Sequence, residues 1–230
     1  MTEGPVLLIT GASSGIGEAT ARAAAEAGHR VVLAARRSVP LGGLARDLGA
    51  PDRALAVPCD VTEWEDQRRL VAAALERFGR IDAVFANAGF GARRGFLEES
   101  PEHWRDMVLT NVYGTALTIR ASVEALRESR GHLLLTGSVA GRKAVPGSLY
   151  SCTKWAVTAM SEAARQELHG SGVRVTLLSP GTVRSPFYDE PVGGNQLVPE
   201  DVARAVMFAL GQPPHVDVNE ILLRPTVQEF

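Results

Sequence analysis

Short, continuous apolar runs alternate along the chain with longer segments in which apolar residues recur every three or four positions. Runs of the first kind, ended by glycine or polar residues, are typical of strands buried on both faces of a sheet. They predict strands over residues 6–9, 31–35, 54–57, 81–86, 133–135, 173–178 and 220–223. Segments of the second kind predict amphipathic helices, over residues 14–27, 41–48, 62–79, 101–126, 149–168 and 199–210.

This strict alternation of strands and helices favours a parallel sheet that is covered by helices on both faces. Crossovers between parallel strands are right-handed, so the sequence predicts a doubly wound, Rossmann-type α/β fold with about seven strands. No break in composition and no long linker divides the chain, which indicates a single domain over residues 1–230. Ligands of such folds bind beyond the carboxyl ends of the strands, so the loops that follow the strands are the candidate functional segments.

Two local signals predict where helices begin. Ser100 followed by Pro101 predicts an N-cap and a first helical residue. Thr62 and Glu65 have the spacing of a capping box. If Thr62 caps that helix, Asp60 is left at the end of the third strand, where it and Val61 could contact an adenine ring. A capping role for Asp60 itself is the alternative.

Composition and charge narrow the functional classes. The chain is 45% hydrophobic and carries a formal charge of −2, which gives no reason to expect nucleic acid or a membrane surface as partner. No apolar run approaches the ~20 residues that a membrane span needs. The first five residues contain no basic region, so a signal peptide is a poor interpretation. Two cysteines without a spacing motif fit a reduced, cytoplasmic setting.

The turn between the first strand and the first helix is rich in glycine and predicts a dinucleotide site. Glycine supplies unusual backbone angles and close approach, and the N-terminus of the helix offers N–H groups and partial positive charge to a phosphate. A purely structural turn is the alternative. The residues expected to contact the cofactor here are Gly11, Ser13, Ser14, Gly15, Ile16 and Gly17.

The end of the second strand indicates which nicotinamide cofactor is preferred. An acidic residue there would bind a free ribose 2′-hydroxyl, but the chain has Arg36 and Arg37 instead. Guanidinium groups bind phosphate oxygens in a bidentate manner. The sequence therefore predicts NADP(H) over NAD(H), with Arg36 as the main contact to the 2′-phosphate and Arg37 or Ser14 as helpers. NAD(H) remains open, since a solvated basic loop is the alternative interpretation.

Tyr150 and Lys154 are four residues apart on a predicted helix and so share one face. Tyrosine ordinarily titrates near ~10, and a nearby cation lowers such a pKa. A tyrosine tuned in this way can act as a general acid or base. An ordinary surface pair is the alternative, and the choice depends on what else the fold brings to the same place.

These residues resemble the short-chain dehydrogenase/reductase family, and the resemblance covers almost the whole chain. The matching residues, in family order, are Thr10 with Gly11, Gly15 and Gly17, then Asn87, Ala88 and Gly89, Asn111, Ser138, Tyr150 with Lys154, and Pro180 with Gly181. The resemblance implies an NAD(P)-dependent oxidoreductase that interconverts a carbonyl and a secondary alcohol. It also implies that Asn87, Ala88, Gly89, Pro180, Gly181 and Val183 join Tyr150 and Lys154 in contacting the cofactor.

The resemblance further implies a Ser–Tyr–Lys–Asn tetrad. Tyr150 would pass a proton to or from the substrate oxygen, and Ser138 would donate a hydrogen bond to that oxygen. Lys154 would hold the nicotinamide ribose and lower the tyrosine pKa, while Asn111 would anchor a water of the proton relay. One departure from the family is Ala86, which stands where many relatives carry a second asparagine. Asn87 alone is then expected to steady that turn.

Substrate specificity is expected in three loops, over residues 90–99, 139–149 and 185–198. Two basic pairs in them, Arg93-Arg94 and Arg142-Lys143, suggest a carboxylated substrate, with solvated loop charge as the alternative. The partner predicted otherwise is a small-molecule carbonyl or alcohol. On family grounds alone, we expect a homotetramer or homodimer.

Other functional classes fit the sequence less well. A serine hydrolase elbow around Ser138 would need glycine where Thr136 stands. The five histidines stand alone, without metal-ligand spacing, so no metal site is predicted. The stronger rival is a binding protein that senses NADP(H) without turnover. Turnover of carbonyls distinguishes the enzyme from the sensor.

Overall fold

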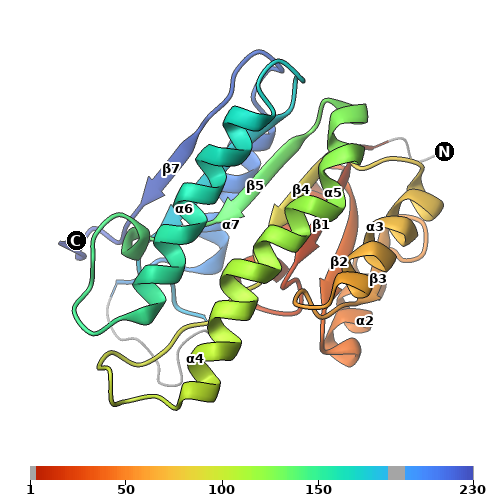
Figure 1. The fold of residues 1–230 in the computed structure, drawn as a ribbon. Helices are drawn as coiled ribbons and strands as arrows, with labels where there is room; N and C mark the ends of the chain where they lie inside the picture. Colours follow the sequence, from red (N-terminus) through yellow and green to blue (C-terminus); the bar gives the residue numbers. More distant parts are fainter. Residues whose placement is uncertain (1–3, 186–194, 230) are drawn as a thin grey trace.

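The computed structural model describes residues 4–185 and 195–229 of the 230-residue chain. Within them, seven parallel strands form one sheet in the order β3-β2-β1-β4-β5-β6-β7 (Figure 1). The strands are β1 Val6–Thr10, β2 Arg30–Ala35, β3 Ala54–Pro58, β4 Ala83–Ala86, β5 His132–Thr136, β6 Arg174–Pro180 and β7 Glu220–Leu223. The predicted doubly wound α/β fold is confirmed. That a single domain extends over residues 1–230 stays a prediction, because residues 1–3, 186–194 and 230 lie outside the described ranges.

Helices cover both faces of the sheet. They are α1 Gly15–Glu26, α2 Ser38–Asp47, α3 Trp64–Phe78, α4 Pro101–Val108, α5 Thr115–Ser129, α6 Leu149–Glu167 and α7 Pro199–Leu210. In Figure 1, α3, α5 and α6 lie on the front face, and α7 lies behind the sheet. Successive residues of β5 enter different cores: Leu133 packs in the cluster with α3, α5 and α6, and Leu134 in the cluster with α1, α2 and α7. This two-sided burial explains why the strands are continuous apolar runs.

The long helix predicted over residues 101–126 is interrupted. Ser100 caps its start as predicted, since its Oγ accepts a hydrogen bond from the backbone N–H of His103 at 3.1 Å. After α4, however, the residues Leu109–Gly114 form a π-helical segment, η1, before α5 continues the helix. Such segments are rare and are frequently found at functional sites. The segment contains Asn111.

The predicted capping box at Thr62 is wrong. The Thr62 hydroxyl donates to Oδ1 of Asp60 at 2.8 Å, the Thr62 backbone N–H donates to the same oxygen at 3.0 Å, and α3 begins at Trp64 after Glu63. Asp and Thr side chains can satisfy nearby backbone groups in a local turn as readily as at a helix terminus. The capping box would have left the Asp60 side chain without a role in the turn, but Asp60 accepts two hydrogen bonds from Thr62.

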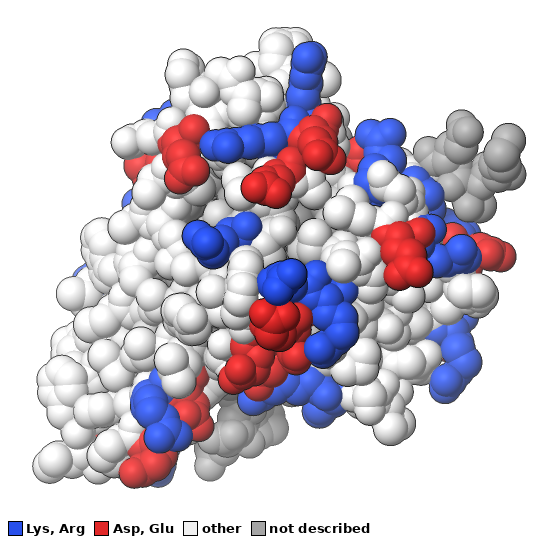
Figure 2. Space-filling model, turned by 45° about the vertical axis from the view of Figure 1, so that its right-hand side comes forward, with Lys and Arg blue, Asp and Glu red and all other residues white. Residues whose placement is uncertain are grey.

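Charged side chains of both signs are intermixed on the face shown in Figure 2, without a large area of one sign. Ion pairs along α3, such as Arg68–Glu65 and Arg69–Asp66, are an example of this arrangement. Exposed pairs of this kind contribute only about 0–1 kcal/mol each. Among the described residues, no helix has both the length and the apolar content to cross a membrane.

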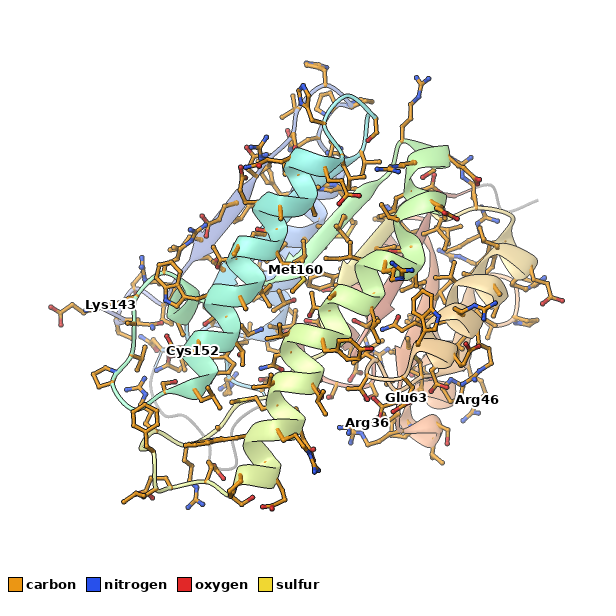
Figure 3. All side chains as sticks on the ribbon, viewed as in Figure 1. Arg36, Arg46, Glu63, Lys143, Cys152 and Met160 are labelled. Atoms are coloured by element: carbon orange, nitrogen blue, oxygen red, sulfur yellow. The ribbon has the colours of Figure 1, made fainter. Side chains whose placement is uncertain are left out.

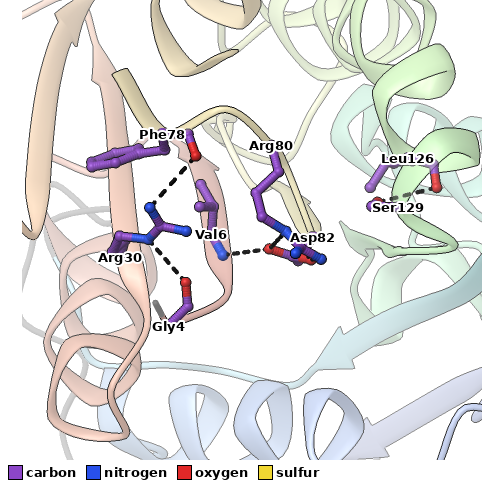
Figure 4. Close-up of polar contacts among 8 residues, drawn as sticks. All are labelled: Gly4, Val6, Arg30, Phe78, Arg80, Asp82, Leu126 and Ser129. Carbon is purple, nitrogen blue, oxygen red and sulfur yellow. Dashed lines mark hydrogen bonds and ion pairs between the residues drawn. The ribbon is translucent and has the colours of Figure 1, made fainter. Parts of the chain in front are cut away.

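The edge of the sheet formed by the amino ends of the strands differs from the edge formed by their carboxyl ends, which we call the carboxyl edge. At the amino ends of the strands, backbone and side chains close the structure: Asp82 Oδ2 accepts from the Val6 backbone N–H at 2.8 Å, and Arg30 Nε donates to the Gly4 carbonyl at 2.9 Å (Figure 4). At the opposite edge lie the carboxyl ends of β1, β2, β4, β5 and β6 with the glycine turn and the family motifs that follow them. Arg36, which follows β2, lies at this edge in Figure 3.

His132 is a buried histidine at the amino end of β5. It is 1% exposed, and its Nε2 lies 2.7 Å from the Thr176 hydroxyl oxygen. Because that hydroxyl donates its own proton to the Val218 carbonyl at 2.6 Å, it must accept from Nε2–H. Burial, reinforced by the charge of Arg174, lowers the pKa of His132 to about 3. His132 is therefore neutral in the folded protein.

We expect this histidine to make the fold sensitive to acid. An unfolded histidine titrates near ~6.5, so below that pH the unfolded chain binds a proton that the folded chain refuses until pH falls to about 3. Within this window, unfolding free energy should drop by up to about 1.4 kcal/mol per pH unit. Urea unfolding of His132→Gln between pH 7.5 and 4.5 should show a smaller drop than wild type. His215→Gln, at an exposed histidine, should follow wild type; equal slopes for all three proteins would contradict the expectation.

Candidate active site

Thr10 and Asn87 hold the carboxyl ends of three adjacent strands together. The backbone N–H groups of Asn87 and Ala88 both donate to Thr10 Oγ1, at 3.0 and 3.1 Å. Asn87 Nδ2 donates to the Thr10 carbonyl at 3.1 Å, and Asn87 Oδ1 accepts from the Thr136 hydroxyl at 3.0 Å. Asn87 thus helps to hold the turn after β4, next to Ala86, but it does not do so alone as predicted, because Thr10 accepts two of the turn's backbone N–H groups.

The glycine turn packs closely against this clamp. Gly11 has φ +67°, and a Cβ on it would lie 2.9 Å from the Cα of Ala88. A Cβ on Gly17 would lie 2.3 Å from the Gly11 carbonyl oxygen, so only glycine fits. The Ser14 side chain makes no capping hydrogen bond to α1. The first turn of α1 therefore presents N–H groups that lack partners within the helix, at the carboxyl edge of the sheet.

The basic residues after β2 flank the turn. Arg36 and Arg37 are both exposed, and Nη2 of Arg37 donates to Ser13 Oγ at 3.2 Å. This contact joins the basic pair to the predicted phosphate-binding turn. On the other side of β2, after β3, the backbone N–H of Asp60 donates to Asp66 Oδ2 at 2.8 Å, so the Asp60-Val61 turn is anchored to α3.

Lys154 is a buried cation beside Tyr150. Helix α6 is capped by Ser148, whose Oγ accepts from the Ser151 backbone N–H at 3.1 Å. One turn further, the Lys154 side chain is only 4% exposed; its Nζ donates to the Thr136 carbonyl at 2.7 Å and lies 5.7 Å from the centre of the Tyr150 ring. Burial lowers the pKa of Lys154 to about 8. Tyr150 and Lys154 thus share one face of α6 as predicted. Because Lys154 is buried, they are not an ordinary surface pair.

Ser138 follows β5 and begins a short 3₁₀ turn, η2 Val139–Gly141. Its Oγ accepts from the Ala140 backbone N–H at 3.1 Å, which leaves the hydroxyl proton to be donated elsewhere. A Cβ on Gly141 would lie 2.6 Å from the Lys154 carbonyl oxygen, so η2 packs directly on α6. Ser151 adds a second link, because its Oγ donates to the Ala140 carbonyl at 2.6 Å.

Asn111 is buried and makes three side-chain hydrogen bonds. Its Oδ1 accepts from the Phe90 backbone N–H at 3.0 Å, and its Nδ2 donates to the Phe90 carbonyl at 2.9 Å and to Thr153 Oγ1 at 3.1 Å. Both Asn111 Oδ1 and Lys154 Nζ lie within 4 Å of the position that a Cβ on Gly89 would take. The fold thus brings Asn111 and Lys154 together, with Gly89 between them.

The segment after β6 presents a backbone donor. Val183 forms a parallel bridge with Leu197, in which the Leu197 N–H donates to the Thr182 carbonyl at 3.1 Å and the Arg184 N–H donates to the Leu197 carbonyl at 2.7 Å. Because a parallel bridge uses the groups on either side of the central residue, the Val183 N–H points away from Leu197. None of the described residues accepts a hydrogen bond from it.

Two of the predicted substrate loops are seen in full. In them Arg93 is paired with Glu99, and Arg142 is paired with Glu220 through both of its donor nitrogens. The side chains of Arg93 and Arg142 are thus already engaged by carboxylates of this chain, so these two arginines give the carboxylated-substrate hypothesis no support. The third predicted loop falls largely on residues 186–194, which lie outside the described residues.

Comparison with known proteins decides the family. The sequence profile of the short chain dehydrogenase family matches residues 5–192. This chain belongs to the short-chain dehydrogenase family. It is 38% identical, over 224 residues and 96% of each chain, to an uncharacterized oxidoreductase of Staphylococcus aureus (strain MRSA252).

Solved structures agree with the family. The chain resembles an alcohol dehydrogenase of the archaeon Thermococcus sibiricus complexed with 5-hydroxy-NADP, with a TM-score of 0.91, 33% identity and 98% coverage of both chains. It also resembles a serine dehydrogenase from Escherichia coli, with a TM-score of 0.88 and 32% identity over 98% of this chain and 100% of that one. The chain is an oxidoreductase of the short-chain dehydrogenase family, and the resemblance read from its motifs is confirmed.

In this dehydrogenase, three polar residues support the site although the sequence did not single them out. Thr153 accepts from Asn111 and donates to the Tyr150 carbonyl at 2.8 Å. Gln67 is fully buried, and its Nε2 donates to the Val61 carbonyl at 3.0 Å and to Thr118 Oγ1 at 2.9 Å. Gln228 accepts from the Thr182 backbone N–H at 2.9 Å. Only Gln67 left a signal, because it occupies the apolar stripe of α3 with Leu70, Ala74 and Phe78.

Proposed function

We propose that this protein is an NADP(H)-dependent oxidoreductase that interconverts a carbonyl and a secondary alcohol, with Tyr150 as the general acid/base. The observation that carries the proposal is the buried Lys154 ammonium, 5.7 Å from the Tyr150 ring centre, at the carboxyl edge of the sheet. Holding a cation out of water is unfavourable, so its presence needs a reason. Lowering the pKa of a catalytic phenol and binding hydroxyls of a ligand are two such reasons.

The residues at this edge fit a nicotinamide dinucleotide. Gly15 has φ +55°, a backbone conformation that favours glycine, and a Cβ on it would lie 3.5 Å from Cβ of Ser185. The N-terminus of α1 suits the pyrophosphate, the Lys154 ammonium suits ribose hydroxyls, and the Val183 N–H suits the amide of the nicotinamide. When bound, the cofactor supplies or accepts the hydride.

The residues of the chain then handle the proton and the substrate oxygen. During carbonyl reduction the Tyr150 hydroxyl gives its proton to the substrate oxygen and becomes a phenolate, and during alcohol oxidation the phenolate takes the proton back from that oxygen. The Ser138 hydroxyl, whose oxygen already accepts from Ala140, donates to the same oxygen and stabilises charge that develops there. Lys154 favours the phenolate of Tyr150. Asn111 holds the Phe90 loop against α6 and anchors a water of the proton relay.

The preference for NADP(H) rests on the basic pair after β2. Arg36 is exposed at the end of the strand, Arg37 reaches Ser13 in the phosphate-binding turn, and no acidic residue stands there to bind a 2′-hydroxyl. The solved alcohol dehydrogenase from T. sibiricus is complexed with an NADP derivative, which is in keeping with this choice. NAD(H) is the alternative cofactor. Homotetramer or homodimer assembly is proposed on family grounds, and a cytoplasmic location is proposed because the two cysteines form no spacing motif.

The test is reduced-cofactor oxidation with a panel of aldehydes and ketones, using NADPH and NADH, in wild type and Arg36→Asp. We expect turnover with at least one carbonyl and a lower KM for NADPH than for NADH. A charged hydrogen bond is worth about 1.5–3 kcal/mol, so Arg36→Asp should raise the KM for NADPH roughly 10- to 100-fold and leave that for NADH little changed.

Arg105→Asp, which makes the same charge change on exposed α4, is the matched control and should behave as wild type. An unchanged cofactor preference in Arg36→Asp would remove the assignment of the 2′-phosphate site. Tight NADPH binding without turnover of any carbonyl would favour the sensor over the enzyme.

A further inference from the structure

The segment that follows β7 folds back over the residues that follow β6. The Gly181 backbone N–H donates to the Leu223 carbonyl at 2.8 Å, where β7 ends. Pro225 in this segment is buried, and the Gln228 backbone N–H donates to the Pro225 carbonyl at 3.0 Å, which forms a turn. This turn directs the Gln228 side chain to Thr182, whose backbone N–H donates to Gln228 Oε1 at 2.9 Å.

Gly181 is shaped to this contact. A Cβ on Gly181 would lie 2.2 Å from Gln228 Oε1 and 3.0 Å from Pro225 Cδ. Any larger residue would push the amide of Gln228 away from Thr182. The glycine of the Pro180-Gly181 motif therefore does more here than turn the chain, because it admits the side chain of Gln228.

Gln228 completes the fixation of the segment on which Val183 lies. On one side of Val183, Leu197 holds the Thr182 carbonyl and the Arg184 N–H. Gln228 takes the remaining backbone donor of Thr182, the residue directly before Val183. Because the backbone groups of Thr182 and Arg184 are held in this way, the direction of the Val183 N–H is fixed. It points away from Leu197.

We propose that Gln228 is a positioning residue for the nicotinamide end of the cofactor. It holds Thr182 so that the Val183 N–H stays aimed at the amide group of the nicotinamide, and it does not touch the reacting atoms. This inference rests on the proposed function. The adenosine end of the cofactor, bound at the glycine turn and at Arg36, lies outside its influence.

Gln228→Met tests this role, because methionine keeps the length of the side chain and removes the whole amide, including the oxygen that accepts from Thr182. One neutral hydrogen bond is worth about 1 kcal/mol, so we expect the KM for NADPH to rise about fivefold and kcat to fall, since the nicotinamide is less well held. The affinity for adenosine 2′,5′-bisphosphate, which lacks the nicotinamide, should equal that of wild type. Gln228→Glu keeps an acceptor oxygen and should stay within about twofold of wild type in kcat/KM, and Glu229→Ala in the same segment is the control.

Three outcomes would overturn the inference: wild-type kinetics in Gln228→Met, equal loss of affinity for NADPH and for adenosine 2′,5′-bisphosphate, or no recovery in Gln228→Glu. Gly181→Ala should reproduce the Gln228→Met result, because its Cβ displaces the same amide. A wild-type protein that binds neither NADPH nor NADH would instead contradict the proposed function. Failure of the Gln228 inference can therefore be distinguished from failure of the proposed function.

Discussion

Tyr150→Phe is expected to lower kcat for carbonyl reduction by about 10²–10⁴-fold, the range that general acid catalysis by a positioned side chain supplies. The variant removes one oxygen and no packing atoms of the ring. Lys154 keeps its bond to the Thr136 carbonyl and the Asn111 network is untouched, since neither uses the tyrosine hydroxyl. The Kd for NADPH, measured by fluorescence titration, should therefore change little.

Tyr113→Phe is the matched control for this experiment. Tyr113 is 48% exposed in η1, two residues from Asn111, so it tests whether loss of any phenol oxygen near the site has the same effect. We expect wild-type kcat for Tyr113→Phe. Turnover by Tyr150→Phe within tenfold of wild type would show that another group carries the proton. That result would also contradict the role of Lys154 in lowering the pKa of Tyr150.

The strands and most helices could be predicted because burial on both faces leaves a plain apolar pattern. β1, for example, is apolar at its first four positions and β5 at its three central positions, and both lie between two layers of helices. The site motifs were equally visible, since glycine at residues 11 and 17 is imposed by steric contacts that no other residue satisfies. Local sterics and burial leave their signature at the residue itself, and a single sequence is enough to read it.

Features that depend on distant partners could not be predicted in the same way. The π-helical segment around Asn111 leaves the apolar period on either side intact, so it was read as uninterrupted α-helix. Thr62 had the spacing of a cap, but its hydroxyl bonds to Asp60. Gln228 lies 46 residues from Thr182, and nothing in the intervening sequence indicates that the two meet. These contacts are set by tertiary packing, which selects among several locally acceptable hydrogen bonds.

Lys154→Met should lower activity and raise stability together. The ammonium is buried, and its pKa is lowered from 10.5 to about 8 by that burial alone. The shift corresponds to up to about 3 kcal/mol by which the charged side chain disfavours the folded state. Methionine has a similar length without the charge, so at pH 7 the variant should unfold at higher urea than wild type. Its kcat/KM should fall at least about a hundredfold, because Tyr150 loses the cation that tunes it.

The pH dependence of this difference identifies its cause. Below pH 8 the lysine is charged in both the folded and unfolded states, so the advantage of Lys154→Met is complete there. Between pH 8 and 10.5 the folded protein has released the proton and the unfolded chain has not, so wild-type stability rises with pH by about 1.4 kcal/mol per unit and the advantage shrinks. If Lys154→Met were instead less stable than wild type at pH 7, the bond from Lys154 to Thr136 would outweigh desolvation, and the ammonium would be a structural asset whose presence needs no catalytic reason.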